Sequence, residues 1–145
     1  MSAVLRKPRS ARAAVSLIAS VLAAGSGMAL AAGTRVILTG DQEVVRVSTS
    51  ASGNGTITVG DDKSVSGSVT TTGIAGMSAH IHEAGPGENG PVAVPLIKTA
   101  DNVWSVPPGA KLNEAQFKSY KAGHLYVNVH SDAHKDGEIR GQLKP

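Results

Sequence analysis

Short runs of apolar and β-branched residues, separated by Gly, Pro, Asn and Asp, make up most of the chain after residue 31. Runs of this length with such punctuation are typical of an all-β domain. In residues 64–71, Val65 and Val69 alternate with serine and threonine, which predicts a strand with one buried and one hydrated face. We expect strands at residues 34–38, 56–59, 64–71, 79–82, 92–97, 102–106, 124–130 and 137–143. The predicted fold is an antiparallel, Greek-key-like β-sandwich.

The connections between these runs contain a turn, a loop and one short helix. Residues 60–63, Gly-Asp-Asp-Lys, predict a hairpin turn, whereas the small, polar segment 48–55 predicts a loop. The helix is expected after Asn113, whose side chain can form a capping box with Gln116. Gly123 is the expected stop residue of this helix. The apolar residues expected in the core nearby are Leu96, Val103, Trp104 and Val106.

The first 31 residues have the three-part pattern of a secretory signal peptide. Four basic residues are followed by an uncharged stretch at 13–30, which ends in the small-x-small sequence Ala29-Leu30-Ala31. A retained membrane anchor is the alternative, but a spanning helix needs roughly 20 strongly apolar residues, and Gly25-Ser26-Gly27 interrupts this stretch. We expect cleavage after Ala31. Residues 32–145 would then form one periplasmic or secreted domain without a membrane anchor.

Charge and composition exclude some partners and some chemistry. The chain has 14 basic and 11 acidic residues, but 4 of the basic ones precede residue 32, so the expected mature chain has 10 basic against 11 acidic residues and a formal charge of −1. No basic patch or aromatic platform remains to bind nucleic acid. The sequence contains no cysteine, which excludes thiol catalysis and thiolate ligands. Any metal would be held by His, Asp, Glu, Met or backbone oxygen.

The histidines are the strongest candidates for a binding site. His80 and His82 form a His-x-His pair on a predicted strand, where side chains two residues apart point to the same face. Two imidazoles that converge in this way suit zinc or copper. His130, at the end of another strand and near His134, is the expected third ligand. Glu83 is expected either to supply an oxygen ligand or to form a hydrogen bond to one of the ligands. The alternative is that the histidine pair is structural and donates to backbone carbonyls.

Two other features of the sequence, Arg140 and the segment 85–91, are interpreted without a catalytic role. We expect Arg140 to form a structural ion pair with Glu138, Asp136 or Glu83, because the guanidinium fork readily bridges carboxylates; binding of an anion or substrate is the alternative. Residues 85–91, rich in glycine and proline, either fold over the histidines or simply reverse the chain. No Gly-x-Ser-x-Gly motif occurs, so no catalytic residue is assigned.

Five segments in fixed order resemble the CHRD (chordin-type) domain, and together they span residues 34–143. The most specific are Tyr-Val-Asn-Val-His at 126–130 and Gly-Glu-Ile-Arg-Gly at 137–141. The other matching segments are 38–44, 53–59, and His-Ile-His-Glu at 80–83 with the following 89–92. The chain departs from the family pattern at Val44-Val45, where a proline is common, and at Lys135-Asp136, where an Asn-Pro type turn is frequent.

This resemblance implies an extracytoplasmic binding domain rather than a reaction. The family is named for chordin, an extracellular animal protein that binds growth factors, and its bacterial members are commonly small, exported, single-domain proteins. A growth-factor role is not expected of a lone domain with a signal peptide. A weaker similarity, in the His-x-His-Glu strand and the glycine-rich loop after it, is to Cu,Zn superoxide dismutase. The chain lacks the disulfide cysteines and the full ligand set of that enzyme.

Three functions follow from these observations. The leading hypothesis is an exported protein that binds a transition metal, copper rather than zinc, through His80, His82 and His130. The second is a metal-free interaction module whose partner is a protein of the cell envelope or the extracellular space. The third is a copper enzyme similar to superoxide dismutase.

Overall fold

The computed structural model describes residues 31–145, so the predicted signal peptide lies outside the described residues except for its last position. All the predicted strand ranges contain strand, and the predicted helix is present. The elements are β1 (Thr34–Thr39), the 3-10 helix η1 (Gly40–Gln42), β2 (Ser52–Val59), β3 (Val65–Thr72), β4 (Gly76–Glu83), β5 (Val92–Pro95), β6 (Ile97–Ala100), β7 (Val103–Ser105), α1 (Glu114–Lys121), β8 (Leu125–Ser131) and β9 (Ile139–Leu143).

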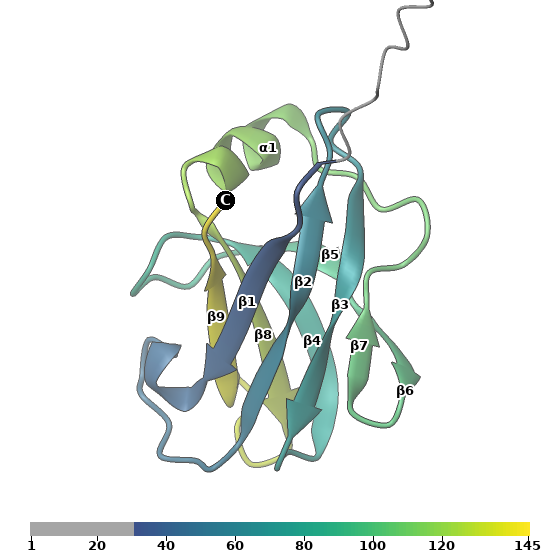
Figure 1. Ribbon diagram of the computed structural model, residues 1–145. Coiled ribbons are helices and arrows are strands. Elements are labelled where there is room, and N and C mark those ends of the chain that lie inside the picture. Colours follow the sequence, from purple (N-terminus) through teal and green to yellow (C-terminus); the bar gives the residue numbers. More distant parts are fainter. Residues whose placement is uncertain (1–30) are drawn as a thin grey trace, which may run out of the picture.

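The strands form two packed layers within one continuous antiparallel sheet. Neighbouring strands follow the order β5-β4-β8-β9-β1-β2-β3-β7-β6. Figure 1 shows β1, β2 and β3 in front of β9, β8 and β4, so the sheet folds back on itself between β1 and β9. At this fold only Thr39 and Arg140 are paired in register. The predicted all-β sandwich with one short helix is confirmed.

Leu96 brings the two free edges of the sheet together. Residues 92–97 were expected to form one strand, but they contribute to two strands, β5 and β6, which are the opposite ends of the sheet order. Pro95 has no N–H to continue the ladder, and Leu96 turns into the core, where its N–H donates to Ala79 O. Because one residue joins the two edges, the sandwich is nearly closed, like a barrel.

Alternating apolar side chains from both layers fill the space between them. Val36 and Leu38 on β1 belong to the same hydrophobic cluster as Val127 and Val129 on β8, and all four side chains are fully buried. Of the expected core residues, Leu96 and Trp104 are buried, Val106 packs against the core, and Val103 is half-buried. The remaining buried apolar residues of the cluster include Ile57, Val69, Ile81, Leu125, Ile139 and Leu143.

We expect Trp104→Ala to lower the free energy of unfolding by about 3 kcal/mol. The Trp104 side chain is only 4% exposed, and large-to-small core changes lose both the transfer free energy and the packing around the cavity. Since the chain has a single tryptophan, urea unfolding should be followed by far-ultraviolet circular dichroism rather than fluorescence. A loss below about 1 kcal/mol would show that the ring contributes little to the core.

The segment 48–55, expected to be a loop, is partly strand. Its second half forms the start of β2, where Ser52 pairs with Thr39 and Gly55 with Val36. The glycines that suggested a loop instead permit close strand packing, since a Cβ at Gly55 would collide with the backbone of Ser68. Glycine in a strand can mark such an approach as well as a break.

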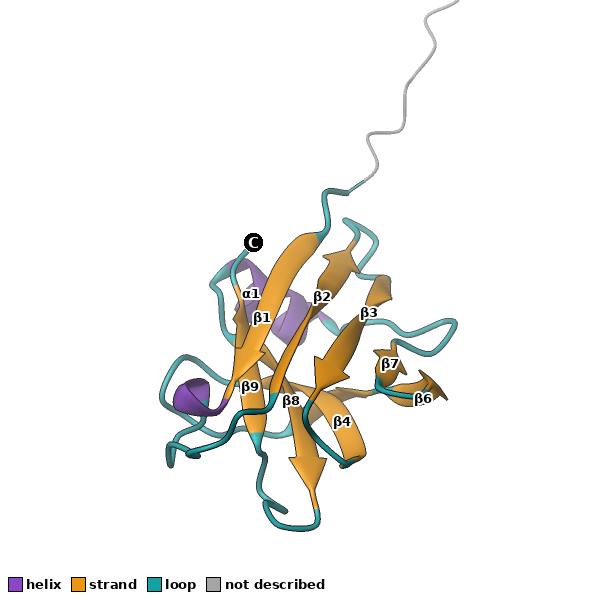
Figure 2. Cartoon of the chain, turned by 60° about the horizontal axis from the view of Figure 1, so that its bottom comes forward, coloured by secondary structure: helices purple, strands orange, loops and turns teal. Residues whose placement is uncertain are grey.

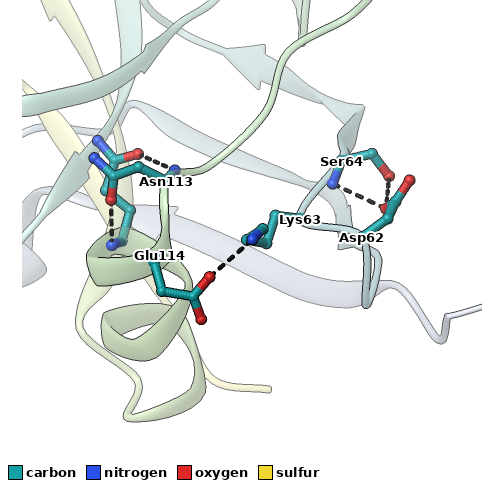
Figure 3. Close-up of polar contacts among 6 residues, drawn as sticks. Asp62, Lys63, Ser64, Asn113 and Glu114 are labelled. Atoms are coloured by element: carbon teal, nitrogen blue, oxygen red, sulfur yellow. Dashed lines mark hydrogen bonds and ion pairs between the residues drawn. The ribbon is translucent and has the colours of Figure 1, made fainter.

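Helix α1 is fixed by its cap and by a contact with the β2–β3 hairpin. Asn113 and Gln116 form the predicted capping box, and Gly123 follows the helix with a φ of 78°. Figure 3 shows Lys63 reaching from the hairpin turn to Glu114 at a distance of 2.8 Å. In Figure 2 both helical segments lie outside the strands. Neither helix of the described part is long and apolar enough to cross a bilayer.

Candidate metal centre

The candidate centre lies on the outer face of β4 and β8. Along β4 the buried side chains of Ala79 and Ile81 point into the core, so the intervening His80 and His82 point outward. This alternation explains why the His-x-His pair shares one face. Strand β8 is the neighbour of β4 and presents its own outward residues to the pair.

The register of β4 and β8 brings His130 to the pair, as expected. His130 lies directly opposite Ser78, and Asn128 lies opposite His80. His130 is therefore the diagonal neighbour of His80, two residues along β8. The His80 Nδ1 and His130 Nε2 atoms are 3.1 Å apart, and the His82 and His130 ring centroids are 6.1 Å apart. One nitrogen from each of these three histidines lies within 4.8 Å of the other two.

Backbone carbonyls determine which ring nitrogens are free. His82 Nδ1 lies 2.9 Å from Gly90 O, and His130 Nδ1 lies 2.8 Å from Lys135 O. A carbonyl oxygen can only accept, so both Nδ1 atoms carry the proton and both Nε2 atoms have a lone pair. The lone pair of His82 Nε2 has no hydrogen-bond partner, whereas that of His130 Nε2 accepts from His80 Nδ1. Histidine ligands of metals commonly donate their second ring N–H in this way, which fixes the ring orientation.

The spacing of these nitrogens is close to that around a metal. Nitrogens bound tetrahedrally at 2.0–2.1 Å are about 3.3 Å apart. His80 Nδ1 and His130 Nε2, at 3.1 Å, already have this spacing through the hydrogen bond between them, whose proton a metal would replace. All three ligand nitrogens lie within 4.8 Å of one another, so no separation has to shorten by more than about 1.5 Å to reach this spacing. His80 and His130 are only half-buried, so their rings have room to move.

Burial keeps the pair on β4 in the neutral, metal-binding form. It lowers the pKa of His80, and the neighbouring His130 and His82 lower it further. Burial also lowers the pKa of His82, although the hydrogen bond to Gly90 acts in the opposite direction. Burial and the neighbouring imidazoles therefore disfavour protonation of His80 and His82, and a bound cation would take the place of the proton.

Tyr126 and Arg140 support the ring of His82 from the side. The rings of His82 and Tyr126 are stacked, with centroids 4.9 Å apart and planes at 6°. The guanidinium carbon of Arg140 lies 3.5 Å from the Tyr126 ring centroid. The Tyr126 hydroxyl also accepts a hydrogen bond from Gly90 N. Tyr126 therefore positions the residue whose carbonyl oxygen accepts from His82 Nδ1.

Arg140 has a structural role, but the prediction that it forms an ion pair with Glu138, Asp136 or Glu83 is wrong. No carboxylate contacts it among the described residues; it donates to Glu88 O at 2.7 Å, to Gly85 O at 2.9 Å and to Gln142 Oε1 at 3.0 Å. The carboxylate of Glu138 instead accepts hydrogen bonds from the hydroxyls of Ser131 and Thr49. The carbonyls of the loop after β4 therefore take the place of a carboxylate. Through these bonds the loop is held over the outer face.

The remaining candidate ligands lie elsewhere. Glu83 follows the alternation of β4 to the other face and accepts from Ser119 Oγ on α1 at 2.7 Å. His124 precedes β8 at the opposite end from His130 and lies near Gly85. His134 lies in the β8–β9 turn, where its backbone N–H donates to Ser131 O. Among the described residues, the triad of His80, His82 and His130 is the one group of metal-ligand type.

Two buried polar residues beside the triad were not found from the sequence. Glu43 and Asn128, together with His82 and His130, line a pocket of about 330 Å³. Burial raises the pKa of Glu43 to about 7, against the opposing effects of Arg140 and Asn128. The alternation of β8 placed Asn128 on the outer face but gave no sign that the η1 loop would cover it. A larger pocket of about 540 Å³, which Glu43 also lines, contains no histidine.

Comparison with known proteins identifies the family. Searches of curated proteins and of solved structures returned no match. The family model described as the CHRD domain matches residues 34–143, which include every strand described above and all three histidines of the triad. The match covers most of the chain, and the chain therefore belongs to the CHRD domain family.

Proposed function

We propose that this protein is an exported CHRD-domain protein that binds a transition metal, copper in preference to zinc, through His80, His82 and His130. The observation that carries the proposal is the convergence of three imidazoles from two neighbouring strands. Two of them have their Nδ1 atoms committed to backbone carbonyls, which leaves Nε2 for the metal.

The ligand type supports copper. Imidazole nitrogen suits copper and zinc, and among divalent first-row metals a given site generally binds Cu²⁺ most tightly. The chain has no cysteine, so no thiolate competes for the metal. Three protein ligands are also fewer than the four of a closed structural zinc site, which leaves room for an exchangeable ligand.

Metal analysis of the protein purified from its own source tests this proposal. One equivalent of copper per chain is the expected result of elemental analysis, with nitrogen couplings from imidazole in the electron paramagnetic resonance spectrum. One equivalent of zinc would retain the site but change its metal. Protein without metal, which also binds no added Cu²⁺, would contradict the proposal and favour the metal-free interaction module.

We expect the affinity for Cu²⁺ to be constant near pH 7.5 and to fall as the pH drops below 6.5. The binding form is neutral imidazole, and the pKa values of His80 and His82 are lowered from 6.5, so protons displace the metal only on the acid side of that value. Competition with a chelator of known protonation behaviour, measured between pH 5 and 8, would check this. Affinity that rises with acid would contradict binding by these rings.

We expect the exported protein to begin near residue 32. The basic and apolar segments before Ala29-Leu30-Ala31 motivate this expectation. The intact mass of protein recovered from the periplasm or the culture medium would locate the first residue. A mass that includes residues 1–31, in protein found in the membrane fraction, would contradict cleavage and favour a retained anchor.

A further inference from the structure

The pocket beside the triad has an unusual surplus of hydrogen-bond acceptors. Four buried side-chain polar atoms of the described residues have no hydrogen-bond partner, and three of them belong to residues that line this pocket: Glu43 Oε1, His82 Nε2 and Asn128 Oδ1. The fourth, Trp104 Nε1, belongs to the core. Unpaired buried polar atoms are rare, and a cluster of them points to a missing partner.

All three of these atoms require a donor or a cation. The carboxylate and amide oxygens accept hydrogen bonds, and His82 Nε2 has a free lone pair because its Nδ1 donates to Gly90 O. Their side chains are nearly inaccessible, with exposed fractions of 7% for Glu43, 9% for His82 and 2% for Asn128. Leaving each of these atoms unpaired in the folded protein is unfavourable. The missing species therefore carries positive charge, protons, or both.

Glu43 and Asn128 meet beside the β8–β9 turn. A Cβ added to Gly137 would lie 2.5 Å from Glu43 Oε1 and 2.6 Å from Asn128 Nδ2, so both atoms lie on one wall of the pocket. The amide group lowers the pKa of Glu43 from this position, but it forms no hydrogen bond of good geometry with Oε1. His82 and His130 line the same pocket, whereas His80 does not. A metal bound by all three histidines would thus lie at the pocket wall, with the pocket on its open side.

We propose that the metal carries a water molecule in this pocket, and that this water donates its two protons to Glu43 Oε1 and Asn128 Oδ1. The inference rests on the proposed metal site and adds its exchangeable ligand. One metal ion and one water satisfy all three acceptors: the metal takes His82 Nε2, and the water takes both oxygens. The pocket then selects a small, neutral hydrogen-bond donor at the metal. A small anion such as superoxide would face the Glu43 carboxylate and would be disfavoured.

The copper-loaded protein can show this water directly. In electron–nuclear double resonance of the Cu²⁺ protein, we expect strongly coupled proton signals that disappear in D₂O and a further coupling in ¹⁷O-enriched water. Imidazole nitrogen couplings in the same sample report the metal site independently. Nitrogen couplings without exchangeable proton or oxygen couplings would overturn the bound water and leave the metal site in place. Absence of any copper signal from the wild type would overturn both.

Azide binding tests the contact with Glu43. Azide is an anion that displaces water from copper and produces a charge-transfer absorption band. At pH 8 we expect Glu43→Gln to bind azide about tenfold more tightly than the wild type, because one negative charge next to the open position is removed. Asp41→Asn is the matched control: it removes the same charge from the same loop, at an exposed position, and should leave azide affinity unchanged. Equal azide affinity in Glu43→Gln and wild type would overturn the contact, and if that variant does not fold, the wild-type proton couplings decide.

Discussion

Replacing His82 with alanine is expected to weaken Cu²⁺ binding at least 100-fold while the protein remains folded. His82 is the most buried member of the triad, and its Nε2 is the free nitrogen. Loss of outer-shell partners alone typically reduces metal affinity 10–100-fold, so loss of a ligand should cost at least the upper end of that range. Isothermal titration or chelator competition with Cu²⁺ would measure the change.

The same variant separates a ligand from a structural histidine. The change leaves Gly90 O without its donor and removes a ring that stacks on Tyr126, so we expect a stability loss of about 1–3 kcal/mol whether or not metal binds. Unfolding in urea, with the metal removed, measures that part alone. His124→Ala is the matched control, because His124 is exposed, lies just before β8 and is outside the triad. Equal Cu²⁺ affinity in His82→Ala and His124→Ala would contradict the site.

Alternation of residue types was sufficient to predict the strands that carry the triad. Polar and apolar residues alternate along β4 and β8, so the shared face of His80 and His82 followed directly from the two-residue period. The prediction that His130 lies nearby required one more assumption, that the two histidine-bearing strands are neighbours. The register of β4 with β8 shows that they are. The role of these histidines as metal ligands stays a prediction.

Features that depend on loops could not be predicted in this way. Tyr126 and Asn128 share the polar face of β8, yet both are buried because residues 85–91 and residues 43–45 after η1 cover them. A loop held by its own carbonyl oxygens has no side-chain signature in the sequence. For this reason the partners of Arg140 were missed, and so was Glu43, whose importance comes only from what surrounds it.

The two departures from the family pattern have a position that the sequence did not reveal. Val44, Val45, Lys135 and Asp136 all line the pocket beside the triad. Because the pocket lies on the open side of the proposed metal, these positions would shape what reaches it, while the histidines themselves match the family pattern.

Arg140→Ala is expected to lower the free energy of unfolding by about 4 kcal/mol, the largest loss predicted for a single change in this protein. Arg140 is 1% exposed, and its guanidinium joins β9 to the loop after β4 through two carbonyls. The variant would leave Glu88 O, Gly85 O and Gln142 Oε1 without this donor, at about 1–3 kcal/mol for each group that water cannot reach. It also creates a cavity beside Tyr126. Urea unfolding of the metal-free protein would measure the loss.

The loss should extend to the metal site, because the loop that Arg140 holds also supplies Gly90 O to His82. We expect Cu²⁺ affinity to fall about tenfold, less than in His82→Ala, since a supporting contact is weakened while every ligand is kept. Arg140→Lys should lose most of the same stability, because an ammonium cannot reproduce the planar fork that reaches both carbonyls. Arg35→Ala is the control: Arg35 is exposed on β1, and its removal should change stability by no more than about 0.5 kcal/mol. If Arg140→Ala were as mild as Arg35→Ala, the loop would not depend on the guanidinium, and the support of His82 would have to come from Tyr126 alone.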